Sequence, residues 1–81
     1  MAYLCAVEEL KARYRAIIAC RLAFEALPSG EAEAHVEILL PQHQIIFNEV
    51  GADADAARAR ALATADARLA ALAKRDPRIL A

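Results

Sequence analysis

The chain contains few of the residues that carry recognisable chemistry. Trp is absent, and two Tyr and two Phe provide all the large aromatic rings among 81 residues. These are too few for a stacking platform that binds single-stranded nucleic acid. Ser29 and Thr64 are the only residues with an aliphatic hydroxyl group, and neither lies in a Gly-rich phosphate loop or a nucleophile elbow. We therefore expect that the protein is not an enzyme.

The sequence also lacks an excess of charge of either sign and long apolar runs. Ten basic and eleven acidic residues leave a net charge of −1, which provides neither a polycation for phosphate backbones nor the acidity of a nucleic-acid mimic. No stretch of about 20 apolar residues could span a bilayer. Glu8 and Glu9 interrupt the N-terminal region before the apolar run of a signal peptide could form. We expect a cytoplasmic protein with no membrane or nucleic-acid partner.

Cysteine and histidine are too few and too widely spaced for a familiar metal site. Cys5 and Cys20 fall in one predicted helix, where 15 residues separate them by roughly 22 Å, so they cannot bridge each other. Two free thiols suit a reducing compartment, although an intermolecular disulfide stays open. Cys5, Cys20, His35 and His43 match the composition of a zinc site, but they include no close Cys pair and no His pair three to five residues apart. We expect no metal, cofactor or small-molecule substrate.

What the sequence does contain is alanine and helical periodicity. Ala accounts for 22 of the 81 residues, which favours helices with thin cores, and a chain this short often needs a partner for stability. The first predicted helix covers about residues 3–26 and stops before Pro28, since proline disfavours helical geometry in the residue before it. One face carries bulky residues in steps of four and three, with Arg21 in the remaining slot: Tyr3, Val7, Leu10, Tyr14, Ile17 and Phe24.

Two further helices complete the predicted fold. The second covers about residues 30–50, is kinked or split near Pro41, and ends at Gly51 as its C′ residue. The third covers about residues 53–75, begins at Asp53 or Asp55 as the cap, and ends at Asp76-Pro77, before a short tail at 77–81. We therefore predict an all-α, three-helix bundle forming a single domain over residues 1–81.

The middle third has a rival interpretation as a β-hairpin at residues 34–50. Residues 36–38 and 44–47 are rich in β-branched side chains, and Pro41-Gln42-His43 could form the loop. The resulting α-β-β-α order is similar in element order and size to the small head–tail joining proteins of tailed phages, which implies a structural or assembly component. Two observations favour the helix. Glu31-Ala32-Glu33-Ala34 is a poor start for a strand, and eight positions of this segment fit one helical stripe.

Two polar residues interrupt the apolar stripes. Arg21 either lies along the core edge and reaches solvent or Glu25, or it pairs across helices with a carboxylate such as Glu37. His43 lies in the second stripe, where a hydrogen-bonded structural role is the simpler interpretation. Arg21 and His43, together with Tyr14 and Phe24 of the bulky face, are candidate interaction residues.

Ile38 and Ile45 are the remaining candidates. In a helix they would lie seven residues apart on the face opposite the main stripe, which predicts a second buried contact. The predicted function is a non-catalytic protein–protein interaction module (an adaptor, inhibitor or assembly factor), most simply a homodimer.

A helix-turn-helix DNA-binding regulator is the first alternative, with Gly51 in the turn, and a small phage component is the second. The recognition helix would present Asp53 and Asp55 to phosphate, which argues against DNA binding.

Overall fold

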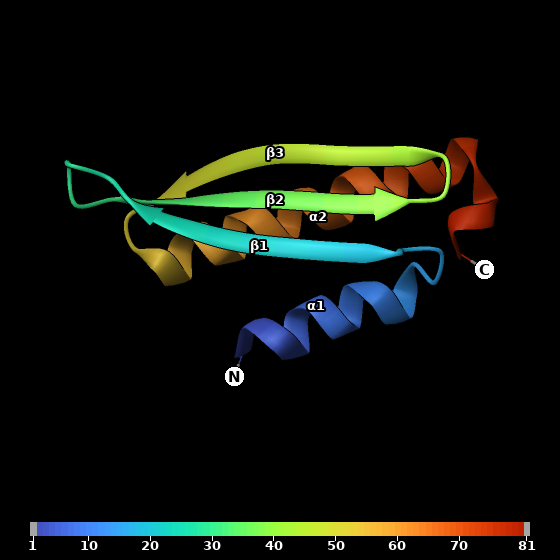
Figure 1. Cartoon of the computed structure of the whole chain (residues 1–81), viewed down its shortest axis with the longest axis horizontal. Helices are drawn as coiled ribbons and strands as arrows, with labels where there is room; N and C mark the ends of the chain where they lie inside the picture. The colour runs from blue at the N-terminus through green and yellow to red at the C-terminus, as the bar shows by residue number, and fades with distance from the viewer. Residues whose placement is uncertain (1, 81) are drawn as a thin grey trace.

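The chain is an α+β structure with a three-stranded antiparallel sheet (Figure 1). The computed structural model describes residues 2–80, and among these the side chains of residues 2–6, which include Tyr3 and Cys5, lie outside the description. The elements in chain order are α1 (Ala2–Arg13), β1 (Ala19–Ala26), β2 (Ala32–Leu40), β3 (His43–Gly51), α2 (Ala54–Arg75) and the 3₁₀ helix η1 (Pro77–Leu80). The sheet order is β1-β2-β3. α2 crosses behind the sheet, and α1 lies beside β1.

The predicted all-α bundle is therefore wrong, and the first helix shows why. α1 ends at Arg13, and residues 19–26 of the predicted helix form β1. The helical spacing of large residues continues only as far as Ile17. Beyond it, Cys20, Leu22 and Phe24 alternate with polar or small residues, which is the period of a strand.

The second predicted helix is also wrong, because residues 32–51 form the hairpin β2–β3. Pro41 and Gln42 form the turn between the two strands and kink no helix. Every second residue of β2 is buried, which marks a strand with one covered face; the buried set is Ala32, Ala34, Val36, Ile38 and Leu40. The alternative hairpin at 34–50 corresponds to β2 and β3, but its α-β-β-α order omits β1.

The core lies between the sheet and α2. Asp53 caps α2 by accepting a hydrogen bond of 2.8 Å from the backbone N–H of Ala56, and the helix falls within the range 53–75 expected from the sequence. The buried side chains of α2 are small toward its N-terminus and larger toward its C-terminus: Ala57, Ala61, Ala65, Leu69 and Leu72. The small side chains let α2 approach the sheet closely. A Cβ atom on Gly51 would lie 2.3 Å from the backbone nitrogen of Ala57.

The ends of the chain complete this core. Leu10 and Tyr14 are buried against it from the α1 side, and Ile79 of η1 is buried at the opposite end of the chain, while Leu80 is half-exposed. The backbone N–H of Ala16, in the loop between α1 and β1, donates to the carbonyl of Ile79 at 3.2 Å, which joins this loop to η1. Among the described helices, none is both long and apolar enough to cross a membrane.

Candidate interaction surface

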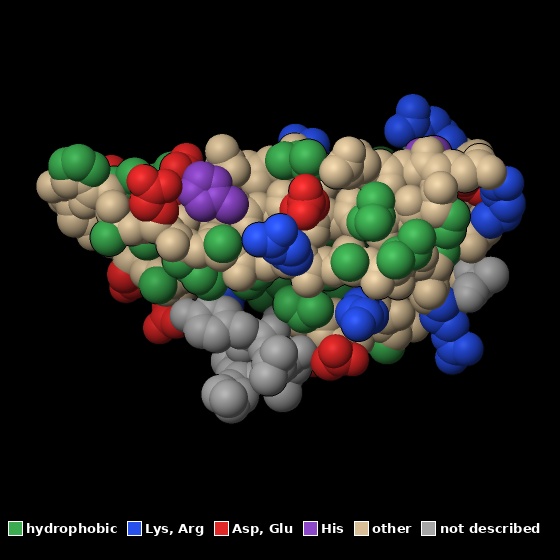
Figure 2. Space-filling model, in the orientation of Figure 1, with side chains coloured by type: hydrophobic (Ala, Val, Ile, Leu, Met, Phe, Trp, Pro, Cys, Tyr) green, Lys and Arg blue, Asp and Glu red, His purple; other side chains and the backbone are tan. Residues whose placement is uncertain are grey.

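The sheet face opposite α2 is open to solvent (Figure 2). The strand register places its side chains in four rows across β1, β2 and β3. From the β2–β3 turn toward the β1–β2 turn, the rows are Ala19/Leu39/Gln44, Arg21/Glu37/Ile46, Ala23/His35/Asn48 and Glu25/Glu33/Val50. No element within residues 2–80 covers this face.

The first two rows hold an exposed apolar patch. Leu39 is 40% exposed and Ile46 is 60% exposed. Ile46 lies opposite Glu37, two residues from Leu39, so the two apolar side chains are diagonal neighbours within reach of each other. Ala19 lies opposite Leu39 on β1. We call Ala19, Leu39 and Ile46 the apolar patch.

Arg21 lies beside the apolar patch on the same open face. Its Nη1 atom is 3.7 Å from Oε1 of Glu37. The predicted pairing of Arg21 with Glu37 is thus present, but it joins neighbouring strands rather than two helices. Both side chains are largely exposed, so the pair contributes little to stability and its charges are accessible to a partner.

A polar cluster occupies the other two rows of the open face. Nδ1 of His35 lies 2.9 Å from Oδ1 of Asn48, and Nε2 lies 3.3 Å from Oε1 of Glu25 and 3.5 Å from Oε1 of Glu33. The hydrogen bond to Asn48, followed by the hydrogen bond to Glu25 and the negative charges of Glu33 and Glu25, raises the pKa of His35 above its usual 6.5. We call Glu25, Glu33, His35 and Asn48 the His35 cluster.

Sequence reasoning did not single out this cluster as a site. Glu33 and His35 share a face only if residues 32–40 form a strand, and Glu25 and Asn48 join them only through the pairing of three strands. The alternation Glu33-x-His35-x-Glu37 is the one local signal that could have indicated it.

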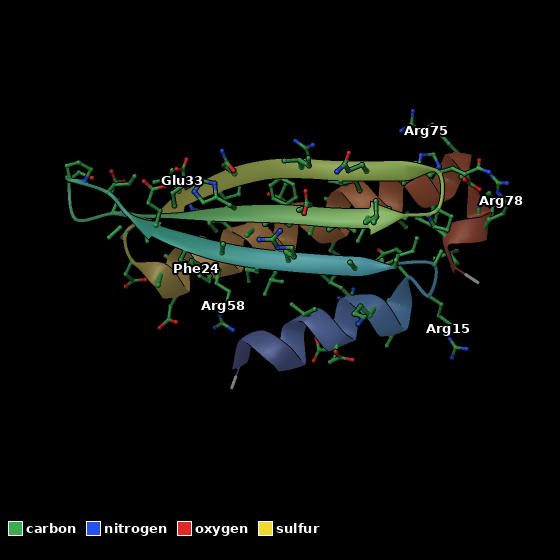
Figure 3. All side chains as sticks on the ribbon, viewed as in Figure 1. Arg15, Phe24, Glu33, Arg58, Arg75 and Arg78 are labelled. Carbon is green, nitrogen blue, oxygen red and sulfur yellow. The ribbon has the colours of Figure 1, made fainter. Side chains whose placement is uncertain are left out.

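Charge is divided between the two ends of the elongated molecule, which measures 41 × 23 × 16 Å. Acidic side chains gather at the β1–β2 turn and the start of α2, and basic ones at the β2–β3 turn and the end of α2 (Figures 2 and 3). The acidic end comprises Glu25, Glu31, Glu33, Glu49, Asp53 and Asp55, with Arg58 in the first turns of α2 as a cation near them. The basic end comprises Arg15, Lys74, Arg75 and Arg78, with Asp76 as a carboxylate among them.

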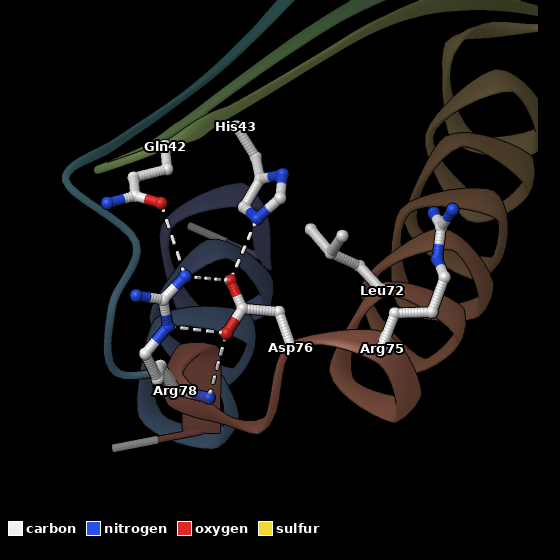
Figure 4. A pocket seen from close by; sticks show the side chains of 6 residues that line it. All are labelled: Gln42, His43, Leu72, Arg75, Asp76 and Arg78. Carbon is white, nitrogen blue, oxygen red and sulfur yellow. Dashed lines mark hydrogen bonds and ion pairs between the residues drawn. The ribbon is translucent and has the colours of Figure 1, made fainter.

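His43 and Asp76 form a bonded group at the basic end (Figure 4). Nε2 of His43 lies 2.9 Å from Oδ2 of Asp76, and the guanidinium of Arg78 donates to both carboxylate oxygens at 2.7 and 3.0 Å. Arg78 also donates to Oε1 of Gln42 at 3.2 Å. These bonds, those from Arg78 first, hold the pKa of Asp76 well below its usual range.

An open pocket of about 530 Å³ adjoins this group and is lined also by Leu72 and Arg75. The His43–Asp76 pair resembles the base and orienting acid of a catalytic site, but within the described residues no nucleophilic side chain lines the pocket. Asp76 is hydrogen-bonded to Arg78 and its side chain is only 14% exposed. The bonds among Gln42, His43, Asp76 and Arg78 therefore hold η1 against the β2–β3 turn.

Two of the sequence-predicted interaction residues lie elsewhere than expected. Ile38 is fully buried, and its cross-strand partner Ile45 packs beside it on the α2 side of the sheet. The prediction that both lie on a second helical face and form a separate buried contact is therefore wrong, because strand alternation directs both side chains toward α2.

Tyr14 and Phe24 also lie off the open face. Tyr14 is buried and its hydroxyl donates to Oδ1 of Asp66 at 2.9 Å; burial and then this contact raise its pKa. Phe24 lies on the α2 side of β1 and is 36% exposed. Among the six predicted residues, Arg21 alone belongs to the open face, and His43 belongs to the bonded group at the basic end.

The helix-turn-helix motif is not formed, because residues 45–50, which had to be its first helix, belong to β3.

Comparison of the chain with protein-family models, with curated proteins and with solved structures finds no match.

Proposed function

We propose that this protein is a non-catalytic protein–protein interaction module that forms a homodimer through the open face of its sheet. The observation that carries the proposal is the apolar patch: Leu39 and Ile46 lie exposed beside each other on a face that no described element covers. Such positions on a sheet are normally packed against a second layer. A second copy of the chain would supply that layer, with the sheets about 10 Å apart.

The charge distribution favours a second copy, in an antiparallel arrangement. A twofold axis across the strands would bring the acidic end of one protomer near the basic end of its partner at both ends of the interface. Opposite charges at the rim direct two molecules into one orientation and speed their encounter. A parallel arrangement would place like charges together and is disfavoured for the same reason.

A simpler explanation for the charge division is compensation of the α2 dipole. Asp53 and Asp55 lie at its N-terminus and Lys74 and Arg75 at its C-terminus, where such charges stabilise a helix. That explanation does not extend to Glu25 and Glu33 on the strands or to Arg15 in the loop before β1. The polarity is therefore a property of the whole surface and not of α2 alone.

We place the module in the cytoplasm, where the free thiol of the partly buried Cys20 would stay reduced. A structural assembly subunit, the second alternative from the sequence, would use the same surfaces. The size of the assembly distinguishes the dimeric module from the assembly subunit. A twofold interface stops at the dimer, whereas head-to-tail contacts between acidic and basic ends continue into polymers.

Sedimentation velocity over a range of micromolar concentrations tests this proposal. We expect a monomer–dimer equilibrium that weakens at high salt, since the rim charges are screened. Ile46→Lys should weaken dimerisation at least tenfold, while the circular dichroism spectrum and the melting temperature, both measured below the dimer concentration range, stay essentially unchanged. Leu80→Lys, which replaces a comparably exposed residue off the sheet, is the matched control and should dimerise like the wild type.

Two results would overturn the proposal. One is a wild-type chain that stays monomeric up to about 100 µM. The other is equal loss of dimerisation in the two lysine variants, which would show that general apolar exposure and not the sheet face drives association.

A further inference from the structure

The strand register places two carboxylates directly opposite each other on the open face. Glu25 of β1 is the cross-strand partner of Glu33 of β2, and like charges in directly opposite positions destabilise a sheet. Both carboxylates turn toward the same atom, Nε2 of His35, at 3.3 and 3.5 Å. The three donor atoms lie within 4.8 Å of one another. An arrangement of this kind is stable when a cation lies among the donors.

The contact with Asn48 determines which ring nitrogen of neutral His35 carries the proton. The carbonyl oxygen of an amide can only accept a hydrogen bond, so the 2.9 Å contact with Oδ1 of Asn48 places a proton on Nδ1. In the neutral ring Nε2 then carries no proton and presents its lone pair to Glu25 and Glu33. Histidines that bind metals are oriented in the same way, with the second ring nitrogen donating to an oxygen.

We propose that Glu25, Glu33 and His35 bind a divalent transition-metal ion such as Zn²⁺, with Asn48 as the residue that orients the imidazole. Ligand atoms about 2.0–2.1 Å from a tetrahedral ion are separated from one another by roughly 3.3–3.5 Å. The distances from Nε2 to the two carboxylate oxygens, 3.3 and 3.5 Å, already match that separation. The partial exposure of the cluster leaves a further coordination position for water.

The donor set selects the class of metal. One imidazole nitrogen with two carboxylate oxygens suits zinc, cobalt and nickel, whereas calcium and magnesium prefer oxygen ligands alone. A proton on Nε2 is the competing cation, since it would equally neutralise the contact with Glu25 and Glu33. Metal binding must therefore release this proton, and the metal affinity rises with pH through the titration of His35.

The site shares the open face with the proposed dimer contact, and Glu25 and Glu33 also belong to the acidic end, but all of its ligands come from one chain. His35 lies four residues along β2 from Leu39, about 13 Å at the rise of a strand. A chain that binds metal but stays monomeric would contradict the dimer alone, and a dimer that binds no metal would contradict the site alone.

Isothermal titration of the full chain with Zn²⁺ and with Co²⁺ at pH 7 tests the site. We expect one ion per chain with a Kd in the micromolar range, and at least a tenfold loss of affinity in both His35→Gln and Glu33→Gln. Glu37→Gln and His43→Gln are the matched controls, because Glu37 shares the open face and His43 is the second histidine, yet neither belongs to the cluster. Both control variants should bind like the wild type.

The absorption spectrum of the Co²⁺ form distinguishes these ligands from the cysteines. Nitrogen and oxygen ligation gives d–d bands without the near-ultraviolet thiolate-to-metal band that a cysteine ligand produces. The proposal is overturned by a thiolate band, by the absence of binding up to 1 mM metal, or by unchanged affinity in His35→Gln and Glu33→Gln.

Discussion

His43, at the start of β3, and Asp76, one residue beyond α2, are joined by a hydrogen bond of 2.9 Å between Nε2 and Oδ2. The same carboxylate accepts from the guanidinium and the backbone N–H of Arg78. One side chain thus connects β3, the end of α2 and η1. The Asp76 side chain thereby holds the turn that positions Ile79 in the core.

The first prediction concerns acid stability. The pKa of Asp76 is lower in the folded than in the unfolded state, where it is about 3.9. The unfolded chain therefore binds more protons near that pH, and the contribution of Asp76 is complete above about pH 5 and lost as the pH falls. Asp76→Asn should be less stable than the wild type in urea at pH 7, and the difference should shrink below pH 4.

Glu37→Gln is the control for this prediction. Its carboxylate is exposed and, among the described residues, pairs with Arg21 alone, at 3.7 Å, so we expect a change within about 0.5 kcal/mol at either pH. A stability difference between Asp76→Asn and wild type that stays constant from pH 7 to pH 3 would contradict the assignment.

The second prediction distinguishes the two faces of the sheet. Ile38→Ala removes a fully buried side chain from the core and should cost about 2–5 kcal/mol. Ile46→Ala removes an exposed one, and in the monomer its effect should stay within about 0.5 kcal/mol. Urea unfolding at a concentration below the dimer range measures both, and comparable losses in the two variants would refute the strand register.

The sequence predicted the last helix correctly but not the first strand. The last helix was recognisable because its cap, its apolar stripe and its Asp76-Pro77 end agree with one another. β1 was missed because Leu10, Tyr14 and Ile17 keep a helical spacing up to the strand. In addition, Ala at positions 19, 23 and 26 has high helix propensity, which tertiary pairing overrides.

The hairpin was predicted only as the alternative to a helix, because both of its faces carry apolar residues. Ile45, Ile46 and Phe47 are consecutive, so the same residues fit a helical stripe and a strand. Arg21 was the overlooked signal in β1: it interrupts a helical seam but fits the alternation of a strand. Only the alternation of Glu33 and His35 along β2 was a local signal of the His35 cluster, because Glu25 and Asn48 join it through the pairing of three strands.

The third prediction concerns the close approach of α2 to the sheet. A Cβ atom on Gly51 would meet backbone atoms of Ala56 and Ala57 at 2.3–2.8 Å, so Gly51→Ala must displace the start of α2. We expect a loss of about 1–3 kcal/mol. Gly30→Ala meets no atom within 4 Å but has a φ of +93°, and it should cost about 1 kcal/mol from backbone conformation alone. Chemical denaturation of both variants measures this, and a wild-type stability for Gly51→Ala would contradict the helix position.

The fourth prediction concerns the titration of His35 in metal-free protein. Its pKa is raised chiefly by the hydrogen bond to Asn48, so Asn48→Ala should lower it, as followed by the ring-proton NMR signals. Because the folded pKa exceeds the unfolded one, the associated stability is present at low pH and is lost as the pH rises through the folded value. An unchanged titration in Asn48→Ala would show that Asn48 does not orient the ring.

The contact that defines the proposed dimer can be observed directly. In a sample that mixes isotope-labelled and unlabelled chains, filtered nuclear Overhauser spectroscopy detects only contacts between protomers. We expect intermolecular signals among the methyl groups of Leu39 and Ile46. A dimer whose intermolecular signals come instead from α1 or α2, with none from these two residues, would contradict it.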